Sequence, residues 1–216
     1  MNVIELFSSI DGEGKRQGFL TTFLRLHDCN IRCSYCDTLY SYGPESTFES
    51  MSVQSVADVI EQLENHRITI TGGEPLLQEP AIIELIDELT RRNARYDFNI
   101  ETNGTIIPSF HRDNVWFTYD YKTPSSLAED AMNLDIFKVA TPADIIKFVV
   151  GSMQDLDRMD EILKTYPTDA QIFVSPVWGN IEGATIVDYM KAHNWQNVRF
   201  QLQIHKFIWD PDAKGV

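Results

Sequence analysis

Residues 21–38, TTFLRLHDCNIRCSYCDT, join a β-rich run to a loop that holds every cysteine of the chain. The cysteines are Cys29, Cys33 and Cys36, in the pattern C-x3-C-x2-C. A structural zinc site closes four protein ligands around the ion, whereas a 4Fe-4S cluster held by three thiolates leaves one iron open to another ligand. Because the thiols are odd in number and no secretory signal precedes them, we expect a reducing compartment and no disulfide.

The spacing alone leaves three interpretations of this loop open. We favour a cluster with one open iron, because the chain has no fourth cysteine to complete an all-thiolate zinc site. One alternative is a zinc site in which His27 is the fourth ligand. The other is that the three thiols bind no metal. Motifs elsewhere in the chain must decide between them.

Composition is that of a globular enzyme or binding protein. The 216 residues, 43% of them hydrophobic, fit one domain over residues 1–216. Apolar runs such as DIIKFVV at residues 144–150 are too short to cross a bilayer, so we expect a cytoplasmic protein without a membrane partner. A net charge of −14 repels polyphosphate backbones, so nucleic acid is not an expected partner.

Short β-rich runs alternate with amphipathic helical runs along most of the chain. The runs expected to form strands are 21–26, 67–71, 96–101, 115–119, 144–150, 170–175 and 198–203. The runs expected to form helices are 53–66 and 153–166, with Ser52 and Ser152 as N-caps, 80–92, with Pro80 in its first turn, and 184–193. This alternation predicts an α/β fold of parallel strands joined by right-handed crossovers, with only helical structure over residues 125–140.

Polar motifs follow the carboxyl ends of four consecutive predicted strands. The motifs are the cysteine loop, Gly72-Gly73, Thr102-Asn103-Gly104 and Asp120-Tyr121-Lys122. Parallel strands end at one edge of a sheet, which is where α/β proteins place their chemistry. We therefore expect these four motifs to meet around one site.

The second motif, Thr71-Gly72-Gly73-Glu74-Pro75, suits a ligand. Glycines let the backbone approach a bound molecule closely, and the Glu74 carboxylate can accept from an ammonium group. The alternative is an ordinary turn between a strand and a helix. Together with the cysteine triplet, the segment resembles the GGEP motif of radical S-adenosylmethionine (SAM) enzymes, in which SAM fills the open iron.

Further segments narrow the resemblance. ETNG at residues 101–104 is similar to a segment of a narrower group within the radical SAM superfamily. The run FSSIDGEG at residues 7–14, Arg25 four residues before the first cysteine, and the tail QIHKFIW at residues 203–209 are similar to 7-carboxy-7-deazaguanine synthases. That resemblance implies a partial parallel (β/α) barrel of the radical SAM type, with about six core strands. It also implies conversion of 6-carboxy-5,6,7,8-tetrahydropterin into 7-carboxy-7-deazaguanine, with ammonia release, in 7-deazapurine (queuosine-type) biosynthesis.

The resemblance also implies cofactors and partners. The cofactors are a 4Fe-4S cluster, SAM and Mg²⁺, and SAM is regenerated rather than consumed. The partners are the pterin, an electron donor such as flavodoxin or ferredoxin, and a second copy of the chain in a homodimer. Two alternatives are kept: an activating enzyme for a glycyl-radical protein, which would have no evident use for Arg25 or Glu13, and a zinc-stabilised binding module without catalysis.

By the same resemblance, each site residue has an expected ligand. The three cysteines hold the cluster and Thr38 binds Mg²⁺. Residues expected to contact SAM are Tyr35, Asp37, Gly73, Glu74, Glu101, Asp120, Tyr121 and Lys122. Residues expected to contact the substrate are Ile10, Asp11, Gly12, Glu13, Arg25, Thr71 and His205.

Two of these segments depart from the family pattern, and three residues have simpler interpretations. Asp11 stands where the family has Gln, and Asp120-Tyr121-Lys122 stands where many members have Ser-Pro-Lys. Arg25 has the planar fork that suits a carboxylate. Without the resemblance, Thr38 would be interpreted as a turn residue, Lys122 as a solvated cation and His205 as a packed imidazole.

Overall fold

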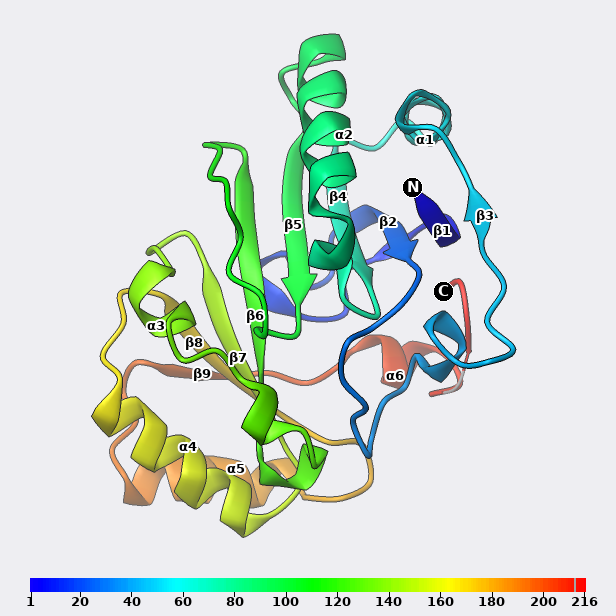
Figure 1. The fold of residues 1–216 in the computed structure, drawn as a ribbon. Helices are drawn as coiled ribbons and strands as arrows, with labels where there is room; N and C mark the ends of the chain where they lie inside the picture. The colour runs from blue at the N-terminus through cyan, green and yellow to red at the C-terminus, as the bar shows by residue number, and fades with distance from the viewer. Residues whose placement is uncertain (212) are drawn as a thin grey trace.

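A computed structural model describes residues 1–211 and 213–216, and its strands form one sheet in the order β3-β1-β2-β4-β5-β6-β7-β8-β9 (Figure 1). The strands are β1 (Asn2–Ile10), β2 (Leu20–Leu26), β3 (Glu49–Ser50), β4 (Arg67–Gly72), β5 (Asp97–Thr102), β6 (Val115–Lys122), β7 (Ile145–Val150), β8 (Gln171–Pro176) and β9 (Val198–Phe200).

All seven predicted strands are present, and they are parallel. Each neighbouring pair from β2 through β9 is parallel, while β1 pairs antiparallel with both β2 and β3. The parallel part of the sheet therefore has seven strands rather than about six. The strands β1 and β3 were not predicted, since β1 coincides with a segment interpreted as a motif and β3 has only two residues.

The four predicted helices are present, although their bounds differ from the predicted ones by one to four residues. The α-helices are α1 (Val53–Gln62), α2 (Glu79–Arg92), α3 (Ile136–Val139), α4 (Met153–Thr165), α5 (Gly183–Ala192) and α6 (His205–Ile208). The 3₁₀ turns are η1 (Gly14–Arg16), η2 (Leu39–Ser41), η3 (Pro75–Gln78), η4 (Pro124–Ser126) and η5 (Glu129–Ala131). Ser52 and Ser152 cap α1 and α4 as predicted, each accepting a backbone hydrogen bond three residues on. No helix of the described residues is long and apolar enough to span a membrane.

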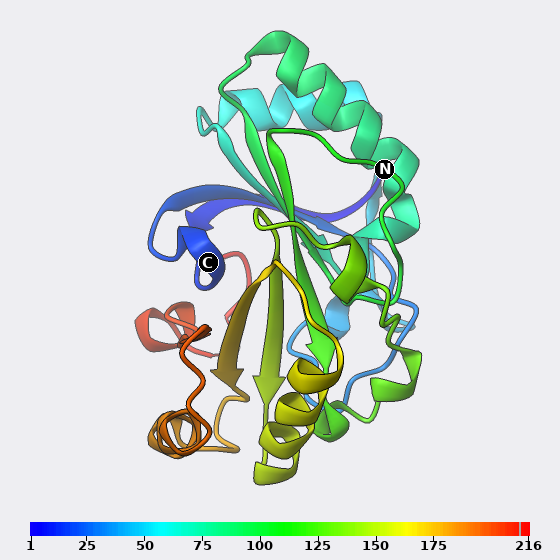
Figure 2. The same ribbon diagram turned by 90° about the vertical axis from the view of Figure 1, so that its left-hand side faces the viewer.

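The hydrophobic core lies between the sheet and the helices. Along β4, Ile68 and Ile70 are fully buried members of this core, whereas Thr69 and Thr71 alternate with them on the other face. Figures 1 and 2 show α1 and α2 packed at one end of the curved sheet and α4 and α5 at the other. The inner, more polar face is thereby left for the N-terminal loop and the C-terminal segment.

Those two segments are joined to each other by hydrogen bonds. Gly14 N donates to Gln201 Oε1 at 2.7 Å, and Gln201 Nε2 donates back to Gly14 O at 2.9 Å. Gln17 Nε2 adds a bond to Leu202 O at 2.6 Å. In Figure 2 the N-terminal hairpin and the red C-terminal segment accordingly run side by side, so the segment after β9 lies across the inner face of the sheet.

Candidate active site

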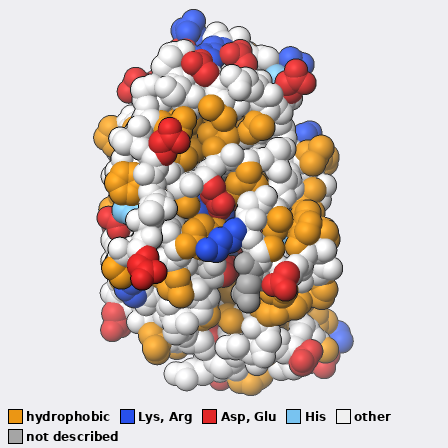
Figure 3. Space-filling model, turned by 90° about the vertical axis from the view of Figure 1, so that its right-hand side faces the viewer, with side chains coloured by type: hydrophobic (Ala, Val, Ile, Leu, Met, Phe, Trp, Pro, Cys, Tyr) orange, Lys and Arg blue, Asp and Glu red, His pale blue; other side chains and the backbone are white. Residues whose placement is uncertain are grey.

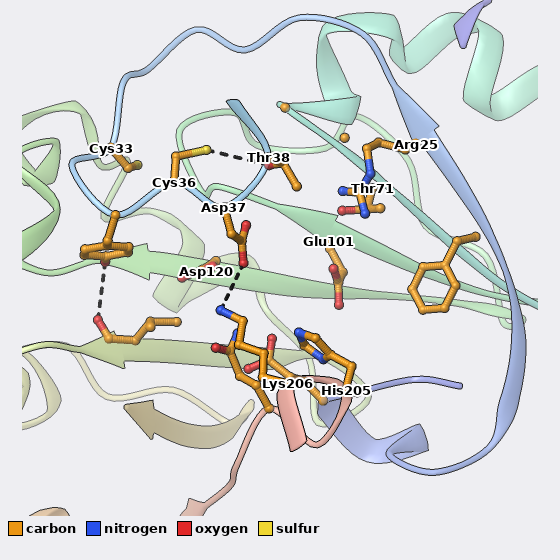
Figure 4. A pocket seen from close by; sticks show the side chains of 18 of the residues that line it. Arg25, Cys33, Cys36, Asp37, Thr38, Thr71, Glu101, Asp120, His205 and Lys206 are labelled. Carbon is orange, nitrogen blue, oxygen red and sulfur yellow. Dashed lines mark hydrogen bonds and ion pairs between the residues drawn. The ribbon is translucent and has the colours of Figure 1, made fainter. Parts of the chain in front are cut away.

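A cavity of about 280 Å³ opens at the carboxyl ends of the parallel strands. It collects residues from the N-terminal loop, the cysteine loop, strands β4 to β7 and the C-terminal segment (Figure 4). The predicted site residues that line it are Ile10, Asp11, Gly12, Glu13, Arg25, Cys29, Cys33, Tyr35, Cys36, Asp37, Thr38, Thr71, Gly73, Glu101, Asp120, Lys122 and His205. Glu74 and Tyr121 are the two predicted residues absent from this lining.

The glycine pair after β4 allows the cysteine loop to pack closely. A Cβ atom on Gly73 would overlap the backbone of Asp28, and one on Gly72 would overlap Leu26 O. Gly72 also has a φ of +152°, where a side chain is strained. The two glycines therefore hold the loop from Asp28 to Cys29 against the end of β4.

The donor set of the loop fits an iron–sulfur cluster. Its three cysteines are free, half-buried and share the cavity, and Asn103 Nδ2 lies 3.7 Å from Cys29 Sγ. Burial raises the pKa of the Cys33 thiol to about 11, so a thiolate there requires a cationic partner such as iron.

The zinc alternative finds less support. The His27 ring packs against Phe48, with centroids 4.4 Å apart, and His27 is not among the residues that line the cavity.

The Glu74 carboxylate differs from expectation because it faces the protein. Glu74 is fully buried, and its oxygens accept hydrogen bonds from Leu76 N, Thr102 Oγ1 and Asn103 N at 2.7–2.9 Å. These donors occupy both oxygens, so the side chain ties the end of β4 to the end of β5. Contact with a ligand at this position is left to the backbone of the loop.

Strand alternation explains why Tyr121 also differs from expectation. Strand β6 continues through Lys122, so Asp120 and Lys122 point to the cavity while Tyr121 points to the core. The Tyr121 ring packs against Phe148, and its hydroxyl donates to Glu129 Oε1 at 2.8 Å. Lys122 Nζ pairs with Asp120 Oδ2 at 3.0 Å.

A buried lysine organises the charges at the other end of the cavity. Lys147 Nζ, from the middle of β7, lies 2.8 Å from Glu13 Oε2 and 3.6 Å from Asp120 Oδ2. Burial alone raises the pKa of Glu13, but Lys147 holds it at about 2. Burial raises the pKa of Glu101 to about 7, against the lowering effect of Lys147. Glu13 is therefore ionised at neutral pH, while Glu101 stands near its titration midpoint.

Arg25 faces this charged region from β2. Its Nε donates to Glu5 Oε1 at 2.6 Å, and Figure 4 shows its guanidinium turned toward Glu101 and Thr71. Arg25 is therefore a half-buried cation with part of its fork available to a ligand carboxylate.

Gly12 and His205 pack directly on each other. A Cβ on Gly12 would overlap the His205 ring, and Ile204 N donates to Gly12 O at 3.1 Å. Burial lowers the pKa of His205, although Glu13 opposes that effect. The imidazole therefore enters the cavity as a neutral donor and acceptor at pH 7.

Asp11 reaches the floor of the cavity rather than its opening. It is 2% exposed, and its carboxylate accepts hydrogen bonds from Thr21 Oγ1 at 2.8 Å and Thr69 Oγ1 at 3.2 Å. Burial raises its pKa, while these hydroxyls and Arg16 oppose the shift. The Asp in place of Gln thus bonds to the strands beneath the site.

The turn after the last cysteine carries the remaining predicted residues. Thr38 Oγ1 lies 3.6 Å from Cys36 Sγ, and Asp37 Oδ2 lies 3.4 Å from Lys206 Nζ (Figure 4). Tyr35 lies between the cysteines, and its hydroxyl donates to Val149 O at 3.3 Å. The loop is therefore anchored to both β7 and the C-terminal segment.

Sequence reasoning missed several charged residues of this region: Lys147, Lys206 and Asp210 line the cavity, and Glu5 pairs with Arg25 beside it. A lone lysine within IIKFVV was a usable signal, since a charge in a buried strand is paired or functional. Glu5 and Lys206 gave no comparable signal. Their roles depend on pairing across strands and on the path of the C-terminal segment.

Comparisons with known proteins agree with this architecture. Residues 25–149 match the radical SAM superfamily. The 7-carboxy-7-deazaguanine synthase of Clostridium acetobutylicum is 38% identical over 99% of this chain and 98% of the relative, and that of Methanospirillum hungatei is 37% identical over 98% and 86%. The enzyme of the same name from Leptospira interrogans is 36% identical over 100% and 98%.

The fold also matches a solved structure. The crystal structure of QueE from Escherichia coli superposes with a TM-score of 0.71 over 93% of this chain and 92% of that one, at 23% identity. Sequence relatives, family model and cysteine loop lead to one conclusion: the chain belongs to the radical SAM superfamily and, within it, to the 7-carboxy-7-deazaguanine synthase family.

Proposed function

We propose that this enzyme converts 6-carboxy-5,6,7,8-tetrahydropterin into 7-carboxy-7-deazaguanine and ammonia. The observation that carries the proposal is one cavity that joins three cysteine thiols to Arg25 and Glu13, in a chain that aligns end to end with enzymes of that name. Substrate and product differ by one ammonia, so the conversion needs no net oxidant. Arg25 and Glu13 have no evident use in an activating enzyme whose target is a protein.

The end of the cavity next to the cysteine loop is proposed to bind the cofactors. Cys29, Cys33 and Cys36 would hold a 4Fe-4S cluster, which with SAM supplies the one-electron chemistry that starts the reaction. Residues proposed to contact SAM there are Tyr35, Asp37, Gly73, Asp120 and Lys122, with Glu101 beside them. Glu74 and Tyr121 contribute by fixing the ends of β4 and β6.

Substrate binding falls to the end that carries Arg25. The terminal nitrogens of Arg25 suit the substrate carboxylate, and the ionised Glu13 can accept hydrogen bonds from the amino and ring N–H groups of a pterin. Thr71 and the neutral His205 add donors and acceptors. Backbone groups of Ile10 and Gly12 complete the wall, while Asp11 supports it from below.

A magnesium ion is proposed beside Thr38. Its hydroxyl is a neutral oxygen ligand at the cavity wall, between the cysteine loop and the substrate end. Mg²⁺ retains water and commonly takes few protein ligands, with the remaining oxygens from substrate. The ion would therefore orient the substrate rather than stabilise the fold.

The remaining partners are proposed from chemistry and family. The enzyme works as one domain in the cytoplasm and as a homodimer, with flavodoxin or ferredoxin as its electron source. Acidic, basic and hydrophobic side chains are interspersed on the face shown in Figure 3, which offers little to a polyphosphate chain. The proposed ligand of the site is the small pterin rather than a nucleic acid.

The test is an anaerobic assay with the tetrahydropterin, SAM, Mg²⁺ and a chemical reductant. Mass and ultraviolet spectra of the product should identify 7-carboxy-7-deazaguanine, with ammonia formed in equal amount. Cys33→Ala should lose the cluster and all turnover. SAM cleavage without this product, in protein with full iron content, would show that the substrate assignment is wrong.

A further inference from the structure

An extra residue in β1 sets a carboxylate opposite Arg25. In the antiparallel pairing of β1 with β2, Val3 faces Leu26, yet Glu5 rather than Ile4 faces Arg25. The register shift at Ile4 is a β-bulge, a feature that turns a side chain to the other face of a strand. Without it, an isoleucine would stand beside Arg25.

Glu5 uses one oxygen to hold two partners. Arg25 Nε donates to Glu5 Oε1 at 2.6 Å, and the Tyr40 hydroxyl donates to the same oxygen at 2.8 Å. The Arg25 guanidinium lies 5.8 Å from the centre of the Tyr40 ring. The Arg25 and Glu5 side chains are 15% and 20% exposed, so solvent screens this pair only in part.

The contact with Glu5 uses the Nε atom of Arg25 and not its two terminal nitrogens. Among the described residues, no acceptor takes a hydrogen bond from either terminal nitrogen of Arg25. Fixing Nε fixes the plane of the guanidinium, because the fork is rigid. Its two terminal nitrogens then remain for a bidentate contact with a carboxylate in the cavity.

Tyr40 extends the arrangement to the turn of Thr38, which is proposed to bind magnesium. It belongs to η2, which begins directly after Thr38, and Ser41 Oγ closes that turn by donating to Thr38 O at 2.8 Å. A shift of this turn therefore moves the Tyr40 hydroxyl, its Glu5 partner and the Arg25 plane together.

We infer that Glu5 is a positioning residue: with Tyr40 it orients Arg25 so that the two terminal nitrogens form a carboxylate subsite, and it couples this subsite to the turn of Thr38. The inference rests on the proposed function for the identity of the carboxylate. It assigns Glu5 no contact with the reacting atoms.

The test measures binding as well as turnover. On reconstituted protein with SAM present, calorimetry compares the carboxylated tetrahydropterin with tetrahydropterin that lacks the carboxylate. Glu5→Ala should weaken binding of the carboxylated ligand about tenfold, in line with a lost charge-assisted contact, and leave the other ligand unchanged. Tyr40→Phe should act in the same direction and less strongly.

A double variant separates positioning from a general structural role. Glu5→Ala in an Arg25→Ala background should add nothing further, because Glu5 acts through Arg25. Glu49→Ala, an exposed carboxylate on the neighbouring β3, is the matched control and should change neither ligand. Glu5→Gln, which keeps the shape, serves if Glu5→Ala does not fold.

Results that contradict the role of Glu5 can be told apart from failure of the proposed function. Equal loss for both ligands, additive effects of Glu5→Ala and Arg25→Ala, or unchanged binding in Glu5→Ala would each overturn the inference. If wild-type enzyme binds the carboxylated pterin but forms no 7-carboxy-7-deazaguanine, the proposed function fails while the binding ratios still decide the role of Glu5.

Discussion

Lys147 Nζ lies 2.8 Å from Glu13 Oε2, although the two residues are 134 positions apart in the chain. The lysine comes from the middle of the parallel sheet and the glutamate from the N-terminal loop, and their side chains are 7% and 11% exposed. A buried pair of this kind costs desolvation of both ions, which its attraction offsets only when both partners are present. The pair thus holds the N-terminal loop against β7.

Removing one member of the pair should be costly. Lys147→Met leaves Glu13 buried without its cation, so we expect the free energy of unfolding to fall by about 3 kcal/mol and the Michaelis constant for the pterin to rise. Urea unfolding of anaerobically purified protein measures the first effect. Lys147→Met combined with Glu13→Gln should be more stable than Lys147→Met alone; a double variant that is less stable would contradict the ion-pair explanation.

The raised pKa of Glu101 predicts a pH dependence of stability. Burial raises that pKa from 4.5 to about 7, so the folded state binds the proton more tightly than the unfolded state. The contribution of Glu101 to the free energy of unfolding is therefore fully present below pH 4.5 and is lost as the pH rises through 7. The total loss is about 3 kcal/mol. In the folded protein, Lys147 and Arg25 oppose the shift, whereas Glu13 and Asp11 add to it.

Glu101→Gln should remove this pH-dependent loss. Relative to wild type, the variant should gain unfolding free energy steadily between pH 4.5 and pH 7 and hold that gain at pH 8. Chemical unfolding at several pH values measures the difference. Glu84→Gln, at an exposed position on α2, is the control and should give a flat difference; a flat difference for Glu101→Gln as well would refute the shift.

Contact between Gly12 and His205 predicts a size-dependent effect. Gly12→Ala places a methyl group where the His205 ring lies, so it should displace the imidazole, weaken pterin binding and destabilise the protein by about 1–3 kcal/mol. His205→Ala in the same chain makes room, so the double variant should regain most of the stability but not the affinity. Thermal unfolding and calorimetry report the two quantities, and a double variant no more stable than Gly12→Ala would argue against this contact.

Periodicity predicted the parallel strands because each is a short apolar run between turn signals. The same reasoning missed β1, whose residues are mostly half-buried and show no clear alternation. Pairing partners, rather than local pattern, decide such segments.

The site was predictable where it depends on strand ends and less so where it depends on side-chain direction. The cysteine loop and Gly73 reach the cavity because parallel strands end at one edge. Tyr121 was expected at the site from the resemblance, and the extension of β6 through Lys122 turns its side chain to the core. The position of Glu5 opposite Arg25 depends on a β-bulge, and no local pattern in the sequence predicts that bulge.

Thr38 provides the last prediction, a metal response that depends on one hydroxyl. The Thr38 side chain lies 3.6 Å from Cys36 Sγ at the cavity wall, and an ion there would bridge protein and substrate. Because the proposed ion would act as a template for the bound substrate, Thr38→Ala should lower the rate with Mg²⁺ present and have little effect after chelation.

Titration of Mg²⁺ into wild-type enzyme and Thr38→Ala measures this directly. Thr38→Ser keeps the hydroxyl and is the matched control, so its activation curve should follow wild type while that of Thr38→Ala shifts to higher Mg²⁺. Iron content must be equal in all three proteins, because Thr38 adjoins the cysteine loop. Superimposable curves for wild type and Thr38→Ala would mean that Thr38 only supports the turn that η2 begins, and the magnesium site would have to be sought among other oxygens of the cavity.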